Sequence, residues 1–212
     1  MKNCKSKKLL ILTSIMILLP MVVGFIFWKQ LPDEMATHFG VNGEPNGWSS
    51  KGFAVIGLPL VLLVIHFLSV FATIVDPKFA ENSKKIYSII FWICPVVSVI
   101  VMVMVYGYSL GFELNISRIC CVLTAILFII VGNYLPKCRQ NHVVGIRIPW
   151  TLSDRDNWNY THRIAGYIWI VCGLVLLICS LLMIEWLIVA VLSVAVLVPV
   201  AISYTYYIKH KE

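Results

Sequence analysis

Six long apolar stretches constrain this chain more than any other feature, because each is long enough to cross a lipid bilayer as a helix. A spanning helix needs about 20 predominantly apolar residues. The stretches occupy residues 9–28, 53–75, 86–108, 118–135, 164–184 and 186–208. Only 13% of the residues are charged, against about 25% in soluble domains. The sequence therefore predicts an all-α, polytopic membrane protein with six transmembrane helices.

The distribution of Lys and Arg predicts the orientation of these helices. If the N-terminus lies in the cytoplasm, the inner segments carry 14 of the 17 basic residues and the outer segments keep only Lys29, Lys51 and Arg118. Basic residues concentrate in cytoplasmic loops, so both chain ends are expected inside (N-in/C-in). The net charge of +7 then reflects topology, and direct nucleic-acid binding is not expected.

The expected domain organisation follows from the two longest polar segments. Residues 1–85 form an N-terminal two-span region with a structured extracellular loop at 29–52. Residues 86–212 form a four-span region with a cytoplasmic loop at 136–163. Seven cysteines are scattered with no paired spacing, which predicts neither a disulfide framework nor a metal site.

The cytoplasmic loop contains the segment GIRIPWTLSDRDNWNYTHR. Ser153 and Asp156 have the spacing of a capping box, which predicts a helix that begins near Ser153. On this helix Arg155, Asn159 and Arg163 share one polar face, and another carries Trp158 and His162. Such residues suit an anchor at the membrane interface.

The part of the loop before this helix has its own character. Gly145 and Pro149 bracket Arg147, and this apolar stretch could pack back against the bundle with Arg147 directed at a buried partner. A functional loop and a purely structural clamp remain equally open here.

The same segment resembles the signature of the SdpI family, bacterial membrane proteins whose named member gives immunity to a secreted killing peptide. Ile148 stands where the family usually has threonine. The matching residues from which a functional motif is expected are Asn141, Gly145, Arg147, Pro149, Trp150, Thr151, Trp158, His162 and Arg163; Leu152, Thr161 and Gly166 also match.

The outer segment resembles a domain of unknown function that often accompanies this family. Its glycine, asparagine and proline residues predict tight turns, so the loop is expected to be folded. The candidate outer-loop residues are His38, Asn42, Gly43 and Trp48; Leu31, Pro32, Pro45, Gly47 and Lys51 also match.

Catalytic, cofactor and metal sites are not expected. Glu34 and His38 could share a metal if their segment were helical, but Glu44 is the only other nearby ligand and metal sites need three or four. The sequence has none of the common hydrolase or metalloprotease motifs. We therefore expect a protein that is not an enzyme and uses no cofactor.

His66 lies near the middle of the second span, where an ionisable side chain is a functional hypothesis by default. The simpler interpretation is a neutral histidine that is hydrogen-bonded to a neighbouring helix. The alternative is part of a proton-coupled pathway, although no carboxylate or lysine shares the apolar core.

The resemblance implies an immunity and signalling protein of the bacterial plasma membrane, in contact with lipid. It implies a secreted toxin peptide as partner on the outer face and a helix-turn-helix repressor, sequestered at the membrane, on the cytoplasmic face. Six spans, several prolines and His66 leave open an alternative function, that of a small-solute or ion transporter, which would be proton-coupled if His66 takes part. A membrane scaffold is a third possibility.

Overall fold

The computed structural model of the chain describes residues 2–79, 82–182 and 184–210. Within these residues, six helices are long and apolar enough to cross a membrane. They cover Lys7–Ile26, Phe53–Val75, Lys84–Ser109, Ile116–Lys137, Arg155–Leu182 and Trp186–Lys209. The six expected spans are therefore confirmed, and the chain is a helical multi-pass membrane protein. Their direction across the membrane stays a prediction.

The chain folds into two compact units, Met1–Ala72 with Tyr87–Ile116 (unit 1) and Thr73–Ile86 with Ser117–Glu212 (unit 2). Unit 1 contains helix α1 (Lys2–Ile26) and most of helices α2 (Leu58–Val75) and α3 (Lys84–Ser109). The expected division of the chain into an N-terminal two-span region, 1–85, and a four-span region, 86–212, stays a prediction.

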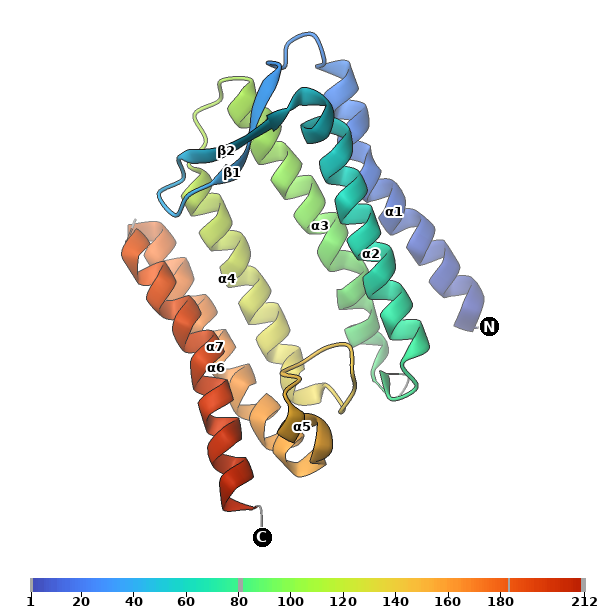
Figure 1. Cartoon of the computed structure of the whole chain (residues 1–212), viewed down its shortest axis with the longest axis vertical. Helices are drawn as coiled ribbons and strands as arrows, with labels where there is room; N and C mark the ends of the chain where they lie inside the picture. Colours follow the sequence, from blue (N-terminus) through green and yellow to red (C-terminus); the bar gives the residue numbers. More distant parts are fainter. Residues whose placement is uncertain (1, 80–81, 183, 211–212) are drawn as a thin grey trace. The chain divides into compact units, whose positions relative to one another are not determined.

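A β-hairpin between α1 and α2 forms the structured part of the outer loop (Figure 1). Strands β1 (Glu34–Phe39) and β2 (Pro45–Ser50) pair antiparallel, with Ala36 opposite Trp48. Gly43 has a φ of 79°, which a glycine adopts without steric cost. Residues 34–50 of this loop therefore form a paired antiparallel hairpin.

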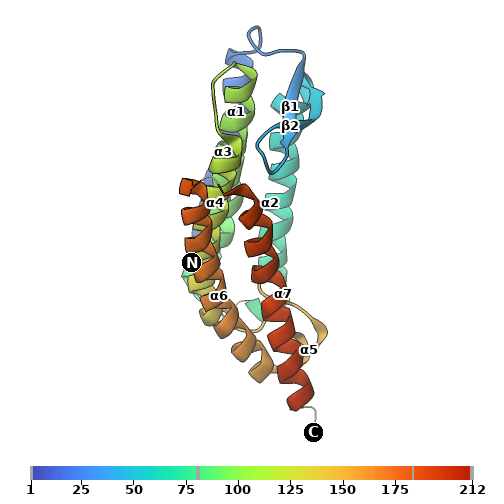
Figure 2. The same ribbon diagram turned by 90° about the vertical axis from the view of Figure 1, so that its left-hand side faces the viewer.

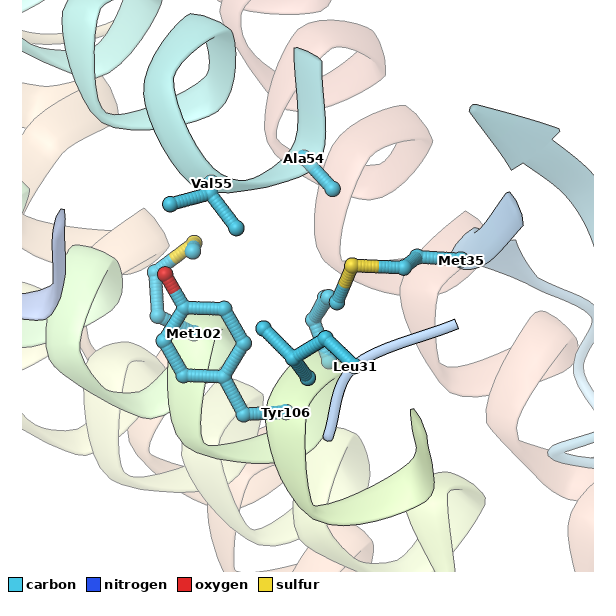
Figure 3. Close-up of a cluster of buried hydrophobic side chains, with 7 residues drawn as sticks. Leu31, Met35, Ala54, Val55, Met102 and Tyr106 are labelled. Carbon is cyan, nitrogen blue, oxygen red and sulfur yellow. The ribbon is translucent and has the colours of Figure 1, made fainter. Parts of the chain in front are cut away.

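A hydrophobic core joins the hairpin to the helices of unit 1 (Figure 3). Leu31 and Met35 meet the first residues of the second span, Ala54 and Val55, which belong to a single π-helical turn at Phe53–Gly57. Met102, Val105 and Tyr106 of α3 complete the cluster. Pro59 follows the π turn, and its lack of an N–H explains an irregular start of the span at this point.

Unit 2 contains α4 (Ile116–Tyr134), the short α5 (Pro149–Ser153), α6 (Arg155–Leu182) and α7 (Glu185–Lys209), with a 3₁₀ turn at Leu135–Lys137. Its core combines Cys121 and Ala125 of α4, Cys172 and Leu176 of α6, and Val191 and Ala195 of α7. The cysteines described, from Cys94 onward, are free thiols.

Glycines let α4 and α6 approach each other closely. A Cβ on Gly166 would lie 2.7 Å from the carbonyl oxygen of Gly132, and a Cβ on Gly173 would lie 2.7 Å from that of Ala125. Small residues at helix contacts are the usual solution in membranes, where dispersion replaces the hydrophobic effect between helices. This explains why Gly166 ends the sequence motif.

Candidate functional site

Side-chain hydrogen bonds hold the loop between α4 and α6, and Figure 2 shows it with α5 beside the ends of α6 and α7. Asn141 organises it from a fully buried position. Its Oδ1 accepts hydrogen bonds from the backbone N–H groups of Val143 and Val144, both at 2.8 Å. Its Nδ2 donates to the carbonyl oxygens of Arg139 and Val144 at 2.7 and 3.1 Å. The side chain thus replaces the secondary structure that the loop lacks.

Trp158 and His162 of α6 form the platform on which the loop lies. The two rings stack with centroids 3.9 Å apart. Trp158 Nε1 donates to the Cys138 carbonyl at 2.9 Å, and the Ile146 N–H donates to His162 Nε2 at 3.0 Å. His162 Nδ1 therefore carries the hydrogen and donates to the Trp158 carbonyl at 2.8 Å. Both residues are buried, so Trp158 is not the interfacial anchor that its sequence context suggests.

Gly145 is the residue through which the loop contacts this platform. Its φ is 126°, in the region that L side chains rarely adopt. A Cβ at this position would lie 2.3 Å from His162 Nε2 and 2.8 Å from the Trp158 ring. Only glycine fits both the backbone conformation and the space.

Pro149, Trp150 and Thr151 form the start of α5 and tie it to its surroundings. Pro149 occupies the first helical position, where its missing N–H costs nothing. Thr151 Oγ1 accepts from the Ile148 N–H at 3.1 Å and lies 2.7 Å from the Ile146 carbonyl. Trp150 Nε1 donates to Ser203 Oγ of α7 at 2.9 Å.

The α2–α3 linker holds the loop from the other side through two side chains that sequence reasoning missed. Asp76 Oδ2 accepts the His142 N–H at 2.6 Å, and Asn82 Oδ1 accepts the Arg139 N–H at 2.8 Å. We call these two contacts the linker latch. Burial raises the pKa of Asp76, but hydrogen bonds from the backbone of His142 and Lys78 and the nearby His142 side chain bring the pKa below its ordinary value.

Sequence reasoning also missed three further residues of the site, Gln140, Asn157 and Ser203. Gln140 Nε2 donates to the Thr151 and Leu152 carbonyls at 2.8 and 3.0 Å. Asn157 accepts from Ser203 Oγ and Thr161 Oγ1, both at 2.9 Å. The local sequence did not mark these residues, because partners of this site lie up to 66 residues apart in the chain.

The basic side chains of the motif face outward. Arg147 is exposed and donates to the His142 carbonyl, so the expected buried partner is wrong. Arg155, Asn159 and Arg163 are exposed along one face of α6, as the spacing predicts. We call Arg147, Arg155, Asn159 and Arg163 together the basic face, after its three arginines. The helix α6 begins at Arg155 rather than near Ser153, because Asp154 is extended and its Oδ1 accepts the Asp156 N–H at 2.8 Å.

The candidate residues of the outer loop lie together in the hairpin. Asn42 Oδ1 accepts the Glu44 N–H at 3.2 Å around Gly43, and His38 Nδ1 hydrogen-bonds Asn46 Oδ1. Trp48 is 56% exposed and offers a large apolar surface. Glu34 and His38 lie on a strand, so the helical arrangement that a shared metal would need does not occur. Within the described ranges, no group of three potential metal ligands is present.

His66 is buried in unit 1, and its Nε2 lies 2.9 Å from Thr13 Oγ1 of α1. The expected hydrogen bond to a neighbouring helix is therefore confirmed. The structure does not bring His66 together with the hairpin residues into one hydrogen-bonded group.

Comparisons with known proteins match both polar regions. Residues 137–203 match the model of the SdpI/YfhL protein family, and residues 15–63 match a domain of unknown function (DUF1648). The chain is similar to the immunity protein SdpI of Bacillus subtilis (strain 168), with 28% identity over 202 residues that cover 94% of this chain and 96% of that protein. No solved structure matches the chain.

Proposed function

Because this chain belongs to the SdpI/YfhL protein family, we propose that it is a multi-pass membrane protein that protects a bacterial cell against a secreted antimicrobial peptide. The observation that carries the proposal is the similarity to an immunity protein along 94% of the chain. Its two folded polar loops are in the same order as the two family regions. The proposed role is binding and signalling without catalysis.

The hairpin is the proposed contact for the toxin peptide. With the predicted N-in orientation it lies on the outer side of the membrane. The exposed Trp48 ring offers an apolar contact at the membrane surface, where amphipathic aromatic residues are favoured. The turn around Gly43 holds this surface in a fixed shape, which limits the entropy lost on binding.

The basic face is the proposed contact for a cytoplasmic repressor. Asn141, Gly145 and the linker latch hold the loop that carries Arg147. The exposed guanidinium groups of the basic face point away from these contacts and are available to a partner. Arginine suits acidic protein surfaces because its planar fork binds carboxylates bidentately. No direct contact of this protein with nucleic acid is proposed.

The test is to express the chain in a sensitive bacterium and to challenge the cells with the agent against which the Bacillus subtilis relative gives immunity. We expect survival, and we expect Arg147→Ala to abolish it at an unchanged membrane level, since the substitution removes a cation and a tie to the His142 carbonyl. Lys209→Ala, at the end of α7, is the matched control and should protect fully. Unchanged killing with the wild-type chain in the membrane would reject the immunity function.

A further inference from the structure

The β-hairpin of the outer loop is a sheet with an open edge. In the part of the chain that the structure describes, β1 and β2 make a sheet of only two strands (Figure 1). Each strand therefore has one side along which no further strand lies. Backbone N–H and C=O groups on such a side are a template for pairing with another chain. The register of the hairpin tells which residues present these groups.

A single hydrogen bond fixes the phase of this register. The Lys51 N–H donates to the Asp33 carbonyl at 2.8 Å. In an antiparallel pair, positions that bond each other alternate with positions whose backbone groups point away from the partner strand. Counting from this bond, Ser50 and Trp48 on β2 and Ala36 on β1 occupy the outward positions.

The outer sides of the two strands differ in exposure. Ala36 is 0% exposed, so the outward backbone groups of β1 are covered at this residue. On β2, Trp48 is 56% exposed and Ser50 is exposed as well. The open edge of the hairpin is therefore that of β2. We call the N–H and C=O of Trp48, together with the N–H of Ser50, the β2 edge.

The β2 edge has none of the protection that proteins usually give to such a strand, which is a charge or a proline. The sequence of residues 46–50, NGWSS, contains neither, and Pro45 precedes these positions at the start of β2. Lys51 follows them, but its Nζ lies 3.0 Å from Asp33 Oδ1 and 5.5 Å from the centre of the Trp28 ring. The lysine is thus engaged elsewhere, and the edge stays open to a further strand.

The core of unit 1 holds this edge in a fixed shape. Met35 of β1 is fully buried in the cluster that contains Ala54 and Val55. Thr37 Oγ1 of β1 lies 2.9 Å from Ser49 Oγ of β2 and ties the two strands together. A two-stranded hairpin alone is only marginally stable, and packing against helices is what stabilises it. A strand that is already ordered loses little entropy when another chain pairs with it.

We propose that the β2 edge binds an extended segment of the secreted peptide, which becomes a third strand of the hairpin. Main-chain hydrogen bonds to Trp48 and Ser50 supply affinity, as in other complexes formed by strand addition. The Trp48 ring packs against the side chain opposite, for which an apolar residue is the favoured neighbour. The identity of the peptide rests on the proposed immunity function. The geometry adds that it is recognised mainly through its backbone, with Trp48 selecting one side chain.

The first test measures amide hydrogen exchange in the ¹⁵N-labelled full chain in detergent micelles by NMR, with and without the agent of the survival test. We expect the N–H groups of Trp48 and Ser50 to exchange at least about tenfold more slowly in the complex, because they become hydrogen-bonded. The Lys51 N–H, already bonded to Asp33, reports whether the hairpin is intact in each sample.

The second test compares two substitutions at Ser50 by titration with the same agent. Ser50→Pro removes the outward N–H, and proline is tolerated at edge positions whose N–H faces solvent. Ser50→Ala is the matched control, because it loses the same hydroxyl contact with the Phe53 N–H but keeps its own N–H. We expect Ser50→Pro to weaken binding about tenfold, the effect of one lost hydrogen bond, and Ser50→Ala to bind like the wild type.

Three results would overturn the proposal. The first is a complex in which Trp48 and Ser50 exchange as fast as in the free protein, since the contact would then use side chains alone. The second is slow exchange of both groups without the agent that increases with protein concentration, which would assign the edge to a second copy of the chain. The third is no binding at all. In each case the survival test decides separately on immunity, because protected cells would retain that function without strand addition. If Ser50→Pro disrupts the hairpin, the exchange of the wild-type chain still decides.

Discussion

At the scale of single residues, Gly145 is the position where the loop tolerates least change. Gly145→Ala would place a Cβ 2.3 Å from His162 Nε2 and would force an alanine to a φ of 126°. We expect a loss of unfolding free energy of about 2 kcal/mol or more, because backbone strain and a lost hydrogen bond add together. Denaturant unfolding in detergent micelles measures it. Gly52→Ala is the control, since Gly52 has a φ of −60° and no neighbour within 4 Å of the added Cβ; equal stability of the two variants would contradict the argument.

The residues of the loop also show what the sequence could and could not predict. The motif marked Asn141, Gly145 and Thr151 as important. The structure shows that Asn141 holds the loop by hydrogen bonds, that Gly145 contacts Trp158 and His162, and that Thr151 lies in α5. Trp158 suggested an interfacial anchor because tryptophan is common at the headgroup level. Its indole N–H instead reaches the Cys138 carbonyl, 20 residues earlier in the chain. A helical wheel gives the face of a side chain, but it does not say what covers that face.

At the scale of elements, the linker latch connects the end of α2 to the loop between α4 and α6. Asp76→Asn removes the charge from a side chain that accepts two backbone N–H groups, those of His142 and Lys78. Hydrogen bonds to charged groups contribute about 1.5–3 kcal/mol, so we expect faster deuterium exchange in residues 138–148, measured by mass spectrometry. Asp33→Asn, in a salt bridge with Lys51 in unit 1, should leave this exchange unchanged. Exchange that is the same in both variants would show that the latch does not hold the loop.

The latch has a pH dependence that follows from the lowered pKa of Asp76. A carboxyl group whose pKa is lower in the folded state stabilises that state above its unfolded pKa, and the stability is lost as the pH falls through the folded pKa. Protection of the loop should therefore stay constant from neutral pH to about pH 5 and fall only below the ordinary carboxyl range near pH 4. A loss of protection between pH 7 and pH 6 would point to a histidine instead. The exchange experiment repeated across this range decides between them.

Elements differed in how well the sequence predicted them. The long helices follow from apolar runs, because a helix in lipid must satisfy its own backbone and needs no distant partner. The hairpin was expected only as a set of turns, since strand pairing in 34–50 depends on a register that short polar sequences specify weakly. The predicted start of α6, near Ser153, lies two residues before the observed start at Arg155. The reason is that α5 is a separate helix, and the extended Asp154 lies between α5 and α6.

At the scale of the whole molecule, the predicted direction of the six spans decides which loop meets the outside. Three spans separate the hairpin from the basic face, so the two must lie on opposite sides of the membrane whichever way the chain inserts. The excess of Lys and Arg, 14 of 17 on one side, predicts that the hairpin is outside. Alkaline phosphatase fusions should therefore be active after residue 48 and inactive after residues 78, 147 and 209. Fluorescent-protein fusions at the same points provide the converse signal, since they fluoresce only when the fusion point is cytoplasmic. Active phosphatase after residue 147 would show that the chain inserts in the opposite direction. The hairpin would then lie in the cytoplasm and would be the surface offered to a cytoplasmic repressor.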